Sequence, residues 1–137
     1  MAESENPVVS QIVNAGIVRE HFGYWPDFHD AEIVKVIFEA HPGYRASVMF
    51  VIAAFEITKG IDERGYYKLA KHCDIKLQFT GIQEIEFNDF GHQNVIFGLT
   101  LEESGSNIKC TFDSSVGMDA VIVAEEALVL SLTPTKQ

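Results

Sequence analysis

The sequence predicts an α+β domain in which an N-terminal helix is followed by a largely antiparallel sheet of about six strands. Two observations predict it. Apolar residues recur at helical spacing only near the N-terminus, and the rest of the chain carries alternating apolar runs joined mainly by short turns. The 137 residues fit one domain, residues 1–137, with frayed ends at about 1–6 and 133–137. A domain of this length buries a core without disulfides.

The helix is expected to begin at Asn6 and Pro7, because asparagine can cap a helix and proline fits its first turn. Gly23 is expected to end it. Its apolar face is formed by residues at helical spacing: Val9, Ile12, Val13 and Ile17. We expect this helix to cover one face of the sheet.

Two strands are expected next, because the apolar period changes from helical to alternating. In the first strand one face holds Val34, Val36, Phe38 and Ala40, and the other holds Lys35 and Glu39. Residues 41–44 are expected to form a turn. A second strand, from about Arg45 to Thr58, is apolar on both faces, as expected for a strand covered on two sides. The glycines and charges of residues 59–65 then predict an exposed loop.

The regular alternation continues in the C-terminal half. One face of the next strand is expected to be buried: Tyr67, Leu69, Cys73, Ile75, Leu77 and Phe79. A hairpin is expected from residues 95–101 and 108–112, with its turn at 104–107. Residues 119–130 mix helix-forming and strand-forming types and are interpreted as short strands. The last strand is expected at residues 128–132.

Charge and composition exclude several classes of function. The chain has 20 acidic and 10 basic residues, a net charge of −10, which repels nucleic acids and anionic lipid surfaces. The longest apolar run, residues 48–55, is too short to span a bilayer. The first residues lack the features of a signal peptide, so a cytoplasmic location is expected. Cys73 and Cys110 are expected to be buried free thiols in a reducing compartment.

Residues 22–32 concentrate aromatic, histidine and acidic side chains, and two interpretations of them are open. In the functional one, His29 is a base oriented by Asp27 or Asp30, or it joins His21, Asp30 and Glu32 as metal ligands. Adjacent side chains on a strand point apart, which argues against such a metal site. No nucleophile-elbow, dinucleotide-binding or P-loop motif occurs elsewhere in the chain.

In the structural interpretation, which we favour, the same residues organise the fold. Trp25 and Phe28 fill the core between helix and sheet, and Pro26 fixes the bend. Asp27 and Asp30 satisfy backbone amides. We therefore expect no catalytic residue, no bound metal and no cofactor.

The string FGYWPDFHDAEI at residues 22–33, here called the signature segment, resembles the immunity protein 50 family. The family signature W-P-x-F-H-D-A-E is matched at Trp25, Pro26, Phe28, His29, Asp30, Ala31 and Glu32. The resemblance implies a helix followed mostly by strands, and a small cytoplasmic antidote encoded beside a polymorphic bacterial toxin. It also implies stoichiometric binding of that toxin, without catalytic residues. The signature can serve folding or contact.

A second feature favours a protein-binding role. Residues 77–108, here called the acidic segment, contain no Lys or Arg. Its acidic and aromatic residues are candidates for contact with a basic protein partner: Glu84, Glu86, Phe87, Asp89, Phe90, Glu102 and Glu103. A solvated face that keeps the protein soluble accounts for the charges equally well. The alternative function is a small ligand-binding protein or an enzyme, with a pocket around Trp25, His29 and Asp30.

Overall fold

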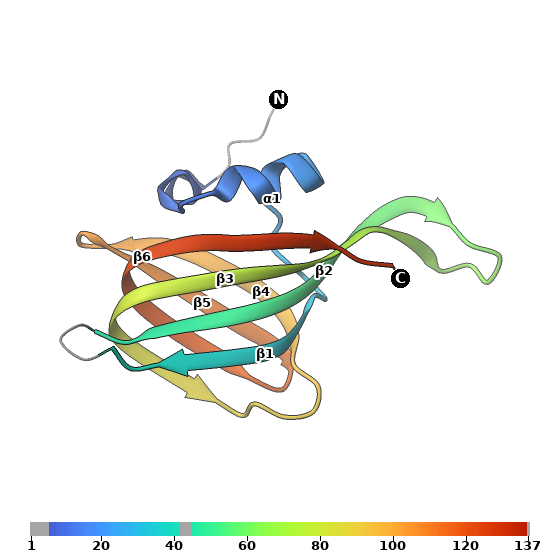
Figure 1. Cartoon of the computed structure of the whole chain (residues 1–137). Coiled ribbons are helices and arrows are strands. Elements are labelled where there is room, and N and C mark those ends of the chain that lie inside the picture. The colour runs from blue at the N-terminus through green and yellow to red at the C-terminus, as the bar shows by residue number, and fades with distance from the viewer. Residues whose placement is uncertain (1–5, 42–44, 137) are drawn as a thin grey trace.

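The computed structural model describes residues 6–41 and 45–136 (Figure 1). Six antiparallel strands close into a barrel in the order β1-β2-β3-β6-β5-β4. Their bounds are β1 Glu32–Glu39, β2 Ser47–Ile61, β3 Tyr67–Asn88, β4 Val95–Ser104, β5 Asn107–Val116 and β6 Asp119–Pro134. The antiparallel sheet and the number of strands are confirmed. The fold is mostly β, however, and the expected α+β balance is wrong because the helical part is short.

The predicted N-terminal helix is divided in two. A 3₁₀ helix, η1, covers Pro7–Gln11, and the α-helix α1 covers Ala15–Phe22. Between them Val13 pairs with β6, donating its N–H to the Ala127 carbonyl at 3.0 Å and accepting from the Val129 N–H at 2.9 Å. This long-range pairing takes Val13 out of helical geometry. The predicted ends are confirmed, since the Asn6 side chain caps η1 and Gly23, with φ +91°, ends α1.

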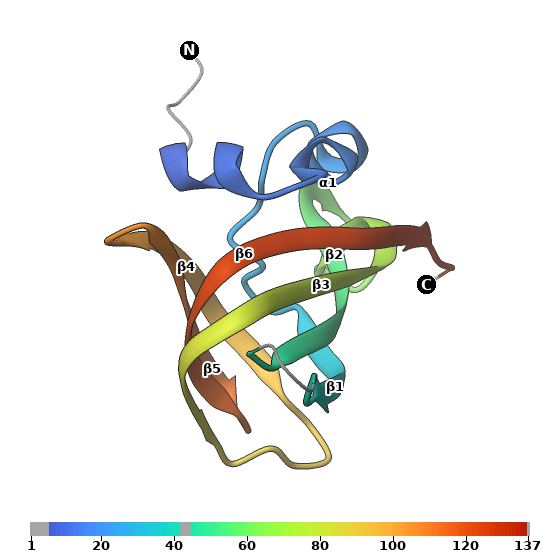
Figure 2. The same cartoon turned by 60° about the vertical axis from the view of Figure 1, so that its left-hand side comes forward.

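The N-terminal segment seals one side of the barrel rather than covering the face of a flat sheet. Strand β5 pairs with β6 only along residues 120–124, which leaves the C-terminal half of β6 without a β5 neighbour. There α1 lies along β6 (Figures 1 and 2), and η1 is joined to β4 by the Asn6 amide, which donates to the Leu101 carbonyl. Val9, Val18 and Phe22 enter the core. None of the described helices is long and apolar enough to cross a membrane.

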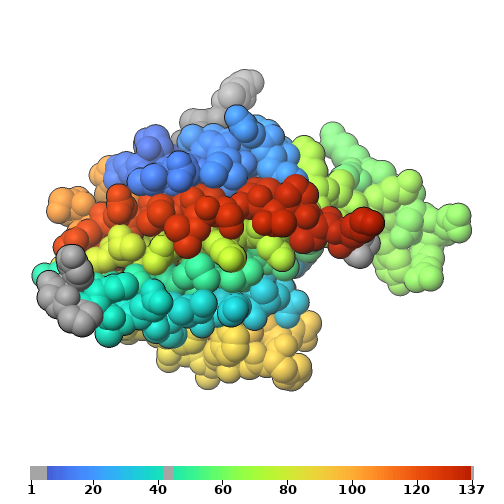
Figure 3. Space-filling view, viewed as in Figure 1, coloured from blue at the N-terminus to red at the C-terminus, as the bar shows by residue number. Residues whose placement is uncertain are grey.

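The alternation of β3 is confirmed in its central part, where Cys73, Ile75, Leu77 and Phe79 are buried. Tyr67 and Leu69 were expected to be buried too, but they are 64% and 45% exposed. The reason is that β2 and β3 continue past the barrel as a two-stranded hairpin, here called the arm and comprising residues 56–71 (Figures 1 and 3). The expected loop 59–65 is thus strand up to Ile61, with a turn after it.

Three further expectations need correction. In β1 the expected face is confirmed in part, because Val36 and Phe38 pair with the buried Phe50 and Val48, although Phe38 is 53% exposed. The register shift after Ile33 buries that residue in place of Val34, which is 51% exposed. Residues 119–130 form part of one continuous strand that reaches Pro134, within the end expected to be frayed. The turn expected at 41–44 lies largely outside the described residues, since 42–44 are not described.

The expected burial of both cysteines is confirmed, because Cys73 and Cys110 are buried free thiols. Burial raises the pKa of the Cys73 thiol to about 11, and the nearby Asp74 carboxylate adds to this increase. Burial also raises the pKa of Cys110. Both thiols therefore stay protonated at neutral pH and behave as small apolar core residues.

Candidate functional site

The signature segment forms a tight turn that leads from α1 into β1. Phe28 and Asp30 have φ angles of +63° and +70°. The turn is closed by the Ala31 N–H, which donates to the Phe28 carbonyl at 3.0 Å, and by the His29 N–H, which donates to the Asp27 carboxylate at 3.0 Å. The Asp30 N–H donates to the Ile96 carbonyl on β4 at 2.8 Å. These bonds fix the turn against the strand that closes the barrel.

The two aromatic residues of this turn differ in burial. Phe28 is 4% exposed and belongs to the core, as expected. Trp25 packs edge-on against Phe28 with ring centroids 5.6 Å apart, but it is only partly buried. The expected core role is therefore confirmed for Phe28 and only partly for Trp25, whose indole also lines a surface hollow.

His29 is exposed and held by backbone. Its Nδ1 donates to the Phe97 carbonyl at 2.8 Å, and its Nε2 lies 3.5 Å from the Asp30 carboxylate. The hydrogen bond to the Phe97 carbonyl raises the pKa of His29, its limited burial lowers it, and the Asp30 and Asp27 carboxylates raise it further. The expectation that His29 and Asp30 point apart is wrong, because the backbone turns between them instead of forming a strand.

This arrangement differs from a catalytic His–Asp pair. In such a pair the carboxylate holds one ring nitrogen while the other nitrogen exchanges a proton with the substrate. Here a backbone carbonyl holds Nδ1, and the Asp30 carboxylate faces Nε2, the nitrogen that would have to act as the base. The contacts of His29 thus support a role in holding the turn against β4.

The four residues considered as metal ligands are not gathered at one point. His21 donates from Nε2 to the Lys71 carbonyl at the base of the arm, at 2.7 Å. Glu32 begins β1 and pairs with Ala53 and Val95. Within residues 6–41 and 45–136, no group of three or more His, Cys, Asp or Glu side chains is placed to hold a metal ion.

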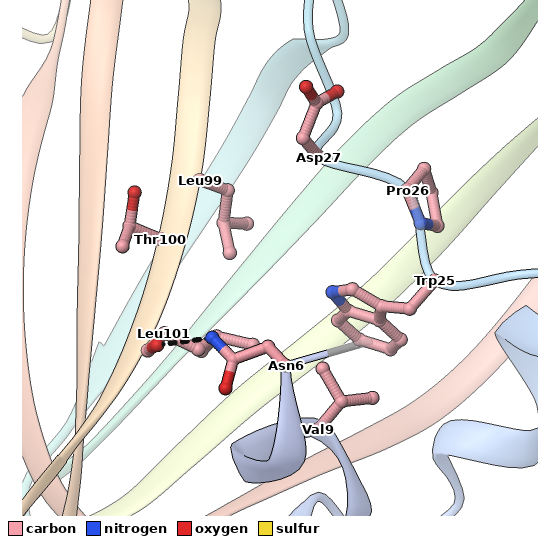
Figure 4. Close-up of a pocket in the computed structure, with 8 residues that line it drawn as sticks. All are labelled: Asn6, Val9, Trp25, Pro26, Asp27, Leu99, Thr100 and Leu101. Carbon is pink, nitrogen blue, oxygen red and sulfur yellow. Dashed lines mark hydrogen bonds between the residues drawn. The ribbon is translucent and has the colours of Figure 1, made fainter. Parts of the chain in front are cut away.

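Two hollows lie beside the signature segment. The smaller, of about 230 Å³, lies between η1, β4 and the signature segment (Figure 4) and is lined by Asn6, Val9, Trp25, Pro26, Asp27, Leu99, Thr100 and Leu101. The larger, of about 400 Å³, includes Trp25 and His29 and extends to Ile57 at the base of the arm. Neither includes Asp30. These two hollows therefore do not bring Trp25, His29 and Asp30 together, as the alternative interpretation requires.

The sheet brings part of the acidic segment together on the outside of the barrel. Glu84 pairs with Val123, Val123 with Lys109, and Lys109 with Glu102, so these side chains form one row across β3, β6, β5 and β4. Glu86 lies two residues from Glu84 on the same side of β3. Glu84, Glu86, Lys109, Val121 and Val123 line a hollow of about 620 Å³ together with Ile85 and Ser104.

Two further acids outside the acidic segment join this surface. Asp113 and Asp119 alternate with the buried Phe112 and Ala120, so they point outward from β5 and β6. We call the outer surface formed by Glu84, Glu86, Glu102, Asp113 and Asp119 the acidic sheet face. Lys109 is the basic residue within it. Sequence reasoning missed Asp113 and Asp119, because only the strand order places them beside the acidic segment.

The other candidates of the acidic segment lie elsewhere. Glu103 accepts a hydrogen bond from the Gln11 side chain of η1 at 3.1 Å. Asp89 follows β3 with a φ of +64°. Phe87 is partly buried and packs against Phe38 and Phe90, with ring centroids 5.2 and 6.4 Å apart. The acidic segment is therefore divided, and Phe87 serves mainly to fill the gap between β1 and β3.

Asn94 is a structural residue that the sequence did not reveal. It is 3% exposed, and its carbonyl oxygen accepts hydrogen bonds from the Gly91 and Met118 N–H groups at 2.9 and 3.1 Å. Its amide nitrogen donates to the Gly91 and Ile33 carbonyls at 3.0 and 3.4 Å. One side chain thus ties the β3–β4 connection to β1 and to the β5–β6 turn. An asparagine in a polar loop gives no sequence signal of this role.

Comparison with known proteins identifies one family. Residues 14–135 match the family described as Immunity protein 50. The match extends far beyond the signature segment and includes α1 and all six strands. No curated protein and no solved structure matched the chain.

Proposed function

Because this chain belongs to the immunity protein 50 family, we propose that it neutralises a cognate bacterial toxin by stoichiometric binding through the acidic sheet face. The binding would take place in the cytoplasm, where the toxin is made. No reaction is assigned to the chain, since a protein that neutralises its target by occupying it needs no catalytic residue.

The observation that carries the proposal is the clustering of charge by strand order. Carboxylates from β3, β4, β5 and β6 share one outer surface, and Glu84 and Glu86 flank an apolar floor formed by Val121 and Val123. A partner with a basic site would meet complementary charge at the rim and apolar contact at the centre. Toxins that act on nucleic acids have such basic sites.

The signature segment supports this function indirectly. Its polar groups are engaged in the fold, because the Asp27 carboxylate holds the His29 N–H and His29 holds the Phe97 carbonyl. Phe28 fills the core. We therefore assign the signature segment to folding and the acidic sheet face to binding.

The test is the rate of association with the toxin domain encoded beside this chain. Electrostatic steering raises association from about 10⁵–10⁶ toward ~10⁸ M⁻¹s⁻¹ at low salt. Since the Debye length is about 8 Å at 0.15 M salt, most of that gain should be lost near ~0.5 M. We expect Glu84→Lys/Glu86→Lys to slow association at low salt and to flatten its salt dependence. Asp113→Lys/Asp119→Lys should do the same.

A matched control separates the acidic sheet face from acidity in general. Glu39→Lys/Glu103→Lys changes the net charge equally, but Glu39 ends β1 and Glu103 lies beside η1. This variant should associate with the toxin domain at most of the parent's rate. If both face variants associate like the parent, the acidic sheet face is not the binding surface. If the parent does not bind the toxin domain at all, the proposed function is wrong.

A further inference from the structure

The arm is an unusual element for a soluble barrel. Beyond Ala53 strand β2 has no β1 partner, and before Cys73 strand β3 has no β6 partner. The arm is therefore a ribbon with two unpaired edges, and Figure 3 shows it as a separate lobe of the molecule. An isolated two-stranded hairpin is only marginally stable, and its open edges invite further association.

One face of the arm is apolar. Ile57 pairs with Leu69 and Ile61 with Tyr67, so each pair shares a face, and Leu69 and Tyr67 lie two residues apart on the same side of β3. Ile57 and Ile61 are 46% and 59% exposed. A continuous set of exposed aliphatic and aromatic side chains on a protruding hairpin is typical of a protein contact.

The arm differs in charge from the rest of the chain. It holds four of the ten Lys and Arg residues and three of the twenty Asp and Glu residues, so it is net positive in a protein of net charge −10. Two of its acids are used internally: Glu56 contacts Lys71 at 3.3 Å, and the Asp62 carboxylate accepts from the Arg64 and Tyr66 N–H groups.

Three of the four cations of the arm remain available for contact. Among the described residues, Lys59, Arg64 and Lys68 form no ion pair. Lys68 lies against Gly60 and lines a hollow at the tip of the arm together with Ile61. Lys68 alternates with Tyr67 and Leu69 and so lies on the opposite face of the arm, near Ile61 at the tip. The arm therefore carries both cations and apolar side chains, and a surface that complements it is acidic around an apolar floor.

We propose that the arm docks on the acidic sheet face of a second copy of this chain. The acidic sheet face has the required charge, and its hollow of about 620 Å³ has Val121 and Val123 in its lining. The basic toxin site proposed above would be repelled by the arm, which argues against the arm as an extension of the toxin contact. Because the arm and the toxin use the same face, the toxin has to displace the second copy in order to bind.

The positions of the two surfaces allow a closed pair. The arm contains the N-terminal end of β3 and the acidic sheet face contains its C-terminal end, so Tyr67 and Glu86 are separated by ~60 Å of strand path. A standard interface covers about 800 Å² per partner, a disc roughly 30 Å across. Two copies in antiparallel orientation, each with its arm on the other copy's acidic sheet face, would form a two-fold pair with two equivalent contacts.

The experiment is sedimentation velocity on the parent, on three variants of the two surfaces and on one control variant, without any toxin. We expect a concentration-dependent monomer–dimer equilibrium that weakens as salt rises. The arm variant Lys59→Glu/Lys68→Glu and the face variant Glu84→Lys/Glu86→Lys should each weaken association at least about tenfold, because each places like charges opposite one another. Mixing the two variants should restore the dimer, since every contact in the mixed pair joins opposite charges.

A control keeps the change in charge but moves it to the other side of the barrel. Lys35 and Lys76 both pair with Val51 on the outer surface of β1, β2 and β3, so Lys35→Glu/Lys76→Glu should dimerise like the parent. A third variant, Ile61→Ser/Tyr67→Ser, should stay folded because both side chains are exposed, and it should be monomeric.

Three results would each overturn the proposal. The first is a parent that stays monomeric at ~1 mM, the weak end of specific affinity. The second is a dimer that both charge variants leave intact, and the third is a mixture of the two variants that does not recover the dimer. If the arm variants instead slow toxin association while the parent is monomeric, the arm is a toxin contact. Because self-association is measured without toxin, failure here leaves the proposed function untouched.

Discussion

At the scale of single residues, the signature segment is best explained by what its side chains hold in place. Its two residues of positive φ, Phe28 and Asp30, stand on either side of His29, and each is fixed by hydrogen bonds to the turn or to β4. Backbone strain of this kind costs of order 1–3 kcal/mol per residue and persists only where surrounding contacts compensate. The burial of Phe28 is the strongest of those contacts.

We predict that Phe28→Ala lowers the free energy of unfolding by about 3–5 kcal/mol, the usual cost of emptying a buried aromatic site. Alanine keeps the β-carbon, so the strain at φ +63° is unchanged and the loss reports packing. Trp25→Ala should cost less, within the ~0.5–3 kcal/mol of ordinary substitutions, because the indole is only partly buried. Urea denaturation measures both. Equal losses of unfolding free energy in the two variants would contradict the assignment of Phe28 as the main packing residue of the signature segment.

His29 provides a prediction on pH. Its pKa is raised above 6.5 in the folded protein, so its protonated form is favoured by folding. The resulting stabilisation is fully present below the unfolded pKa and is lost as the pH rises through the folded pKa. NMR titration should give a pKa above 6.5, and His29→Gln should reduce the stability advantage of the parent on the acidic side.

The control for this titration is Asp30→Asn. Because the Phe97 carbonyl is the largest cause of the increase, Asp30→Asn should lower the pKa of His29 while leaving it above its ordinary value. A pKa at or below 6.5 in the parent would contradict the contact between Nδ1 and the Phe97 carbonyl.

At the scale of elements, the sequence predicts the buried face of a strand well inside the barrel. It predicts that face less well where the strand extends beyond the barrel. The face of Cys73, Ile75, Leu77 and Phe79 is correctly predicted because both neighbouring strands are present there. The same alternation fails at Tyr67 and Leu69, since nothing local indicates that β6, the second neighbour of β3, has ended there. The division of the N-terminal helix has a similar cause, because Val13 pairs with a strand more than a hundred residues away.

The candidate site shows the same pattern. The acidic segment was visible in the sequence, but its division and the addition of Asp113 and Asp119 depend on strand order. The register shifts in the β1–β2, β2–β3, β3–β6 and β4–β5 pairings make this order hard to infer, because each shift changes which side chains face outward.

The β5–β6 turn provides a prediction at this scale. Gly117 has φ +85°, and a Cβ added there would meet the Gln93 carbonyl and lie 2.6 Å from the Asn94 side-chain oxygen. We predict that Gly117→Ala destabilises the protein by about 2–4 kcal/mol, through backbone strain and disruption of the Asn94 hydrogen bonds. Gly98→Ala is the matched control, because an added Cβ there meets nothing within 4 Å, and it should stay within about 0.5 kcal/mol. Similar losses of stability in both variants would contradict the close packing of Gly117 against Gln93 and Asn94.

At the scale of the whole molecule, the barrel is held unevenly around its circumference. The β3–β6 ladder runs from Cys73 with Pro134 to Asn88 with Asp119. The seam that closes the barrel is much shorter: β1 and β4 share one register pair, Glu32 with Val95. Nearby hydrogen bonds extend the seam, among them the Ile33 N–H to the Asn94 carbonyl at 2.9 Å and the Ile96 N–H to the Ala31 carbonyl at 2.8 Å.

This asymmetry predicts that the barrel opens first at the β1–β4 seam. Ile33 and Ile96 are buried, so burial alone would protect their N–H groups until global unfolding. Because few hydrogen bonds close the seam, we expect these N–H groups to exchange with solvent through a local opening of lower free energy than that of Leu77 in the centre of β3. Native-state hydrogen exchange, followed by NMR at increasing denaturant, measures both. Exchange of Ile33 and Ile96 only at the global unfolding free energy would show that the seam is as strong as the long β3–β6 ladder.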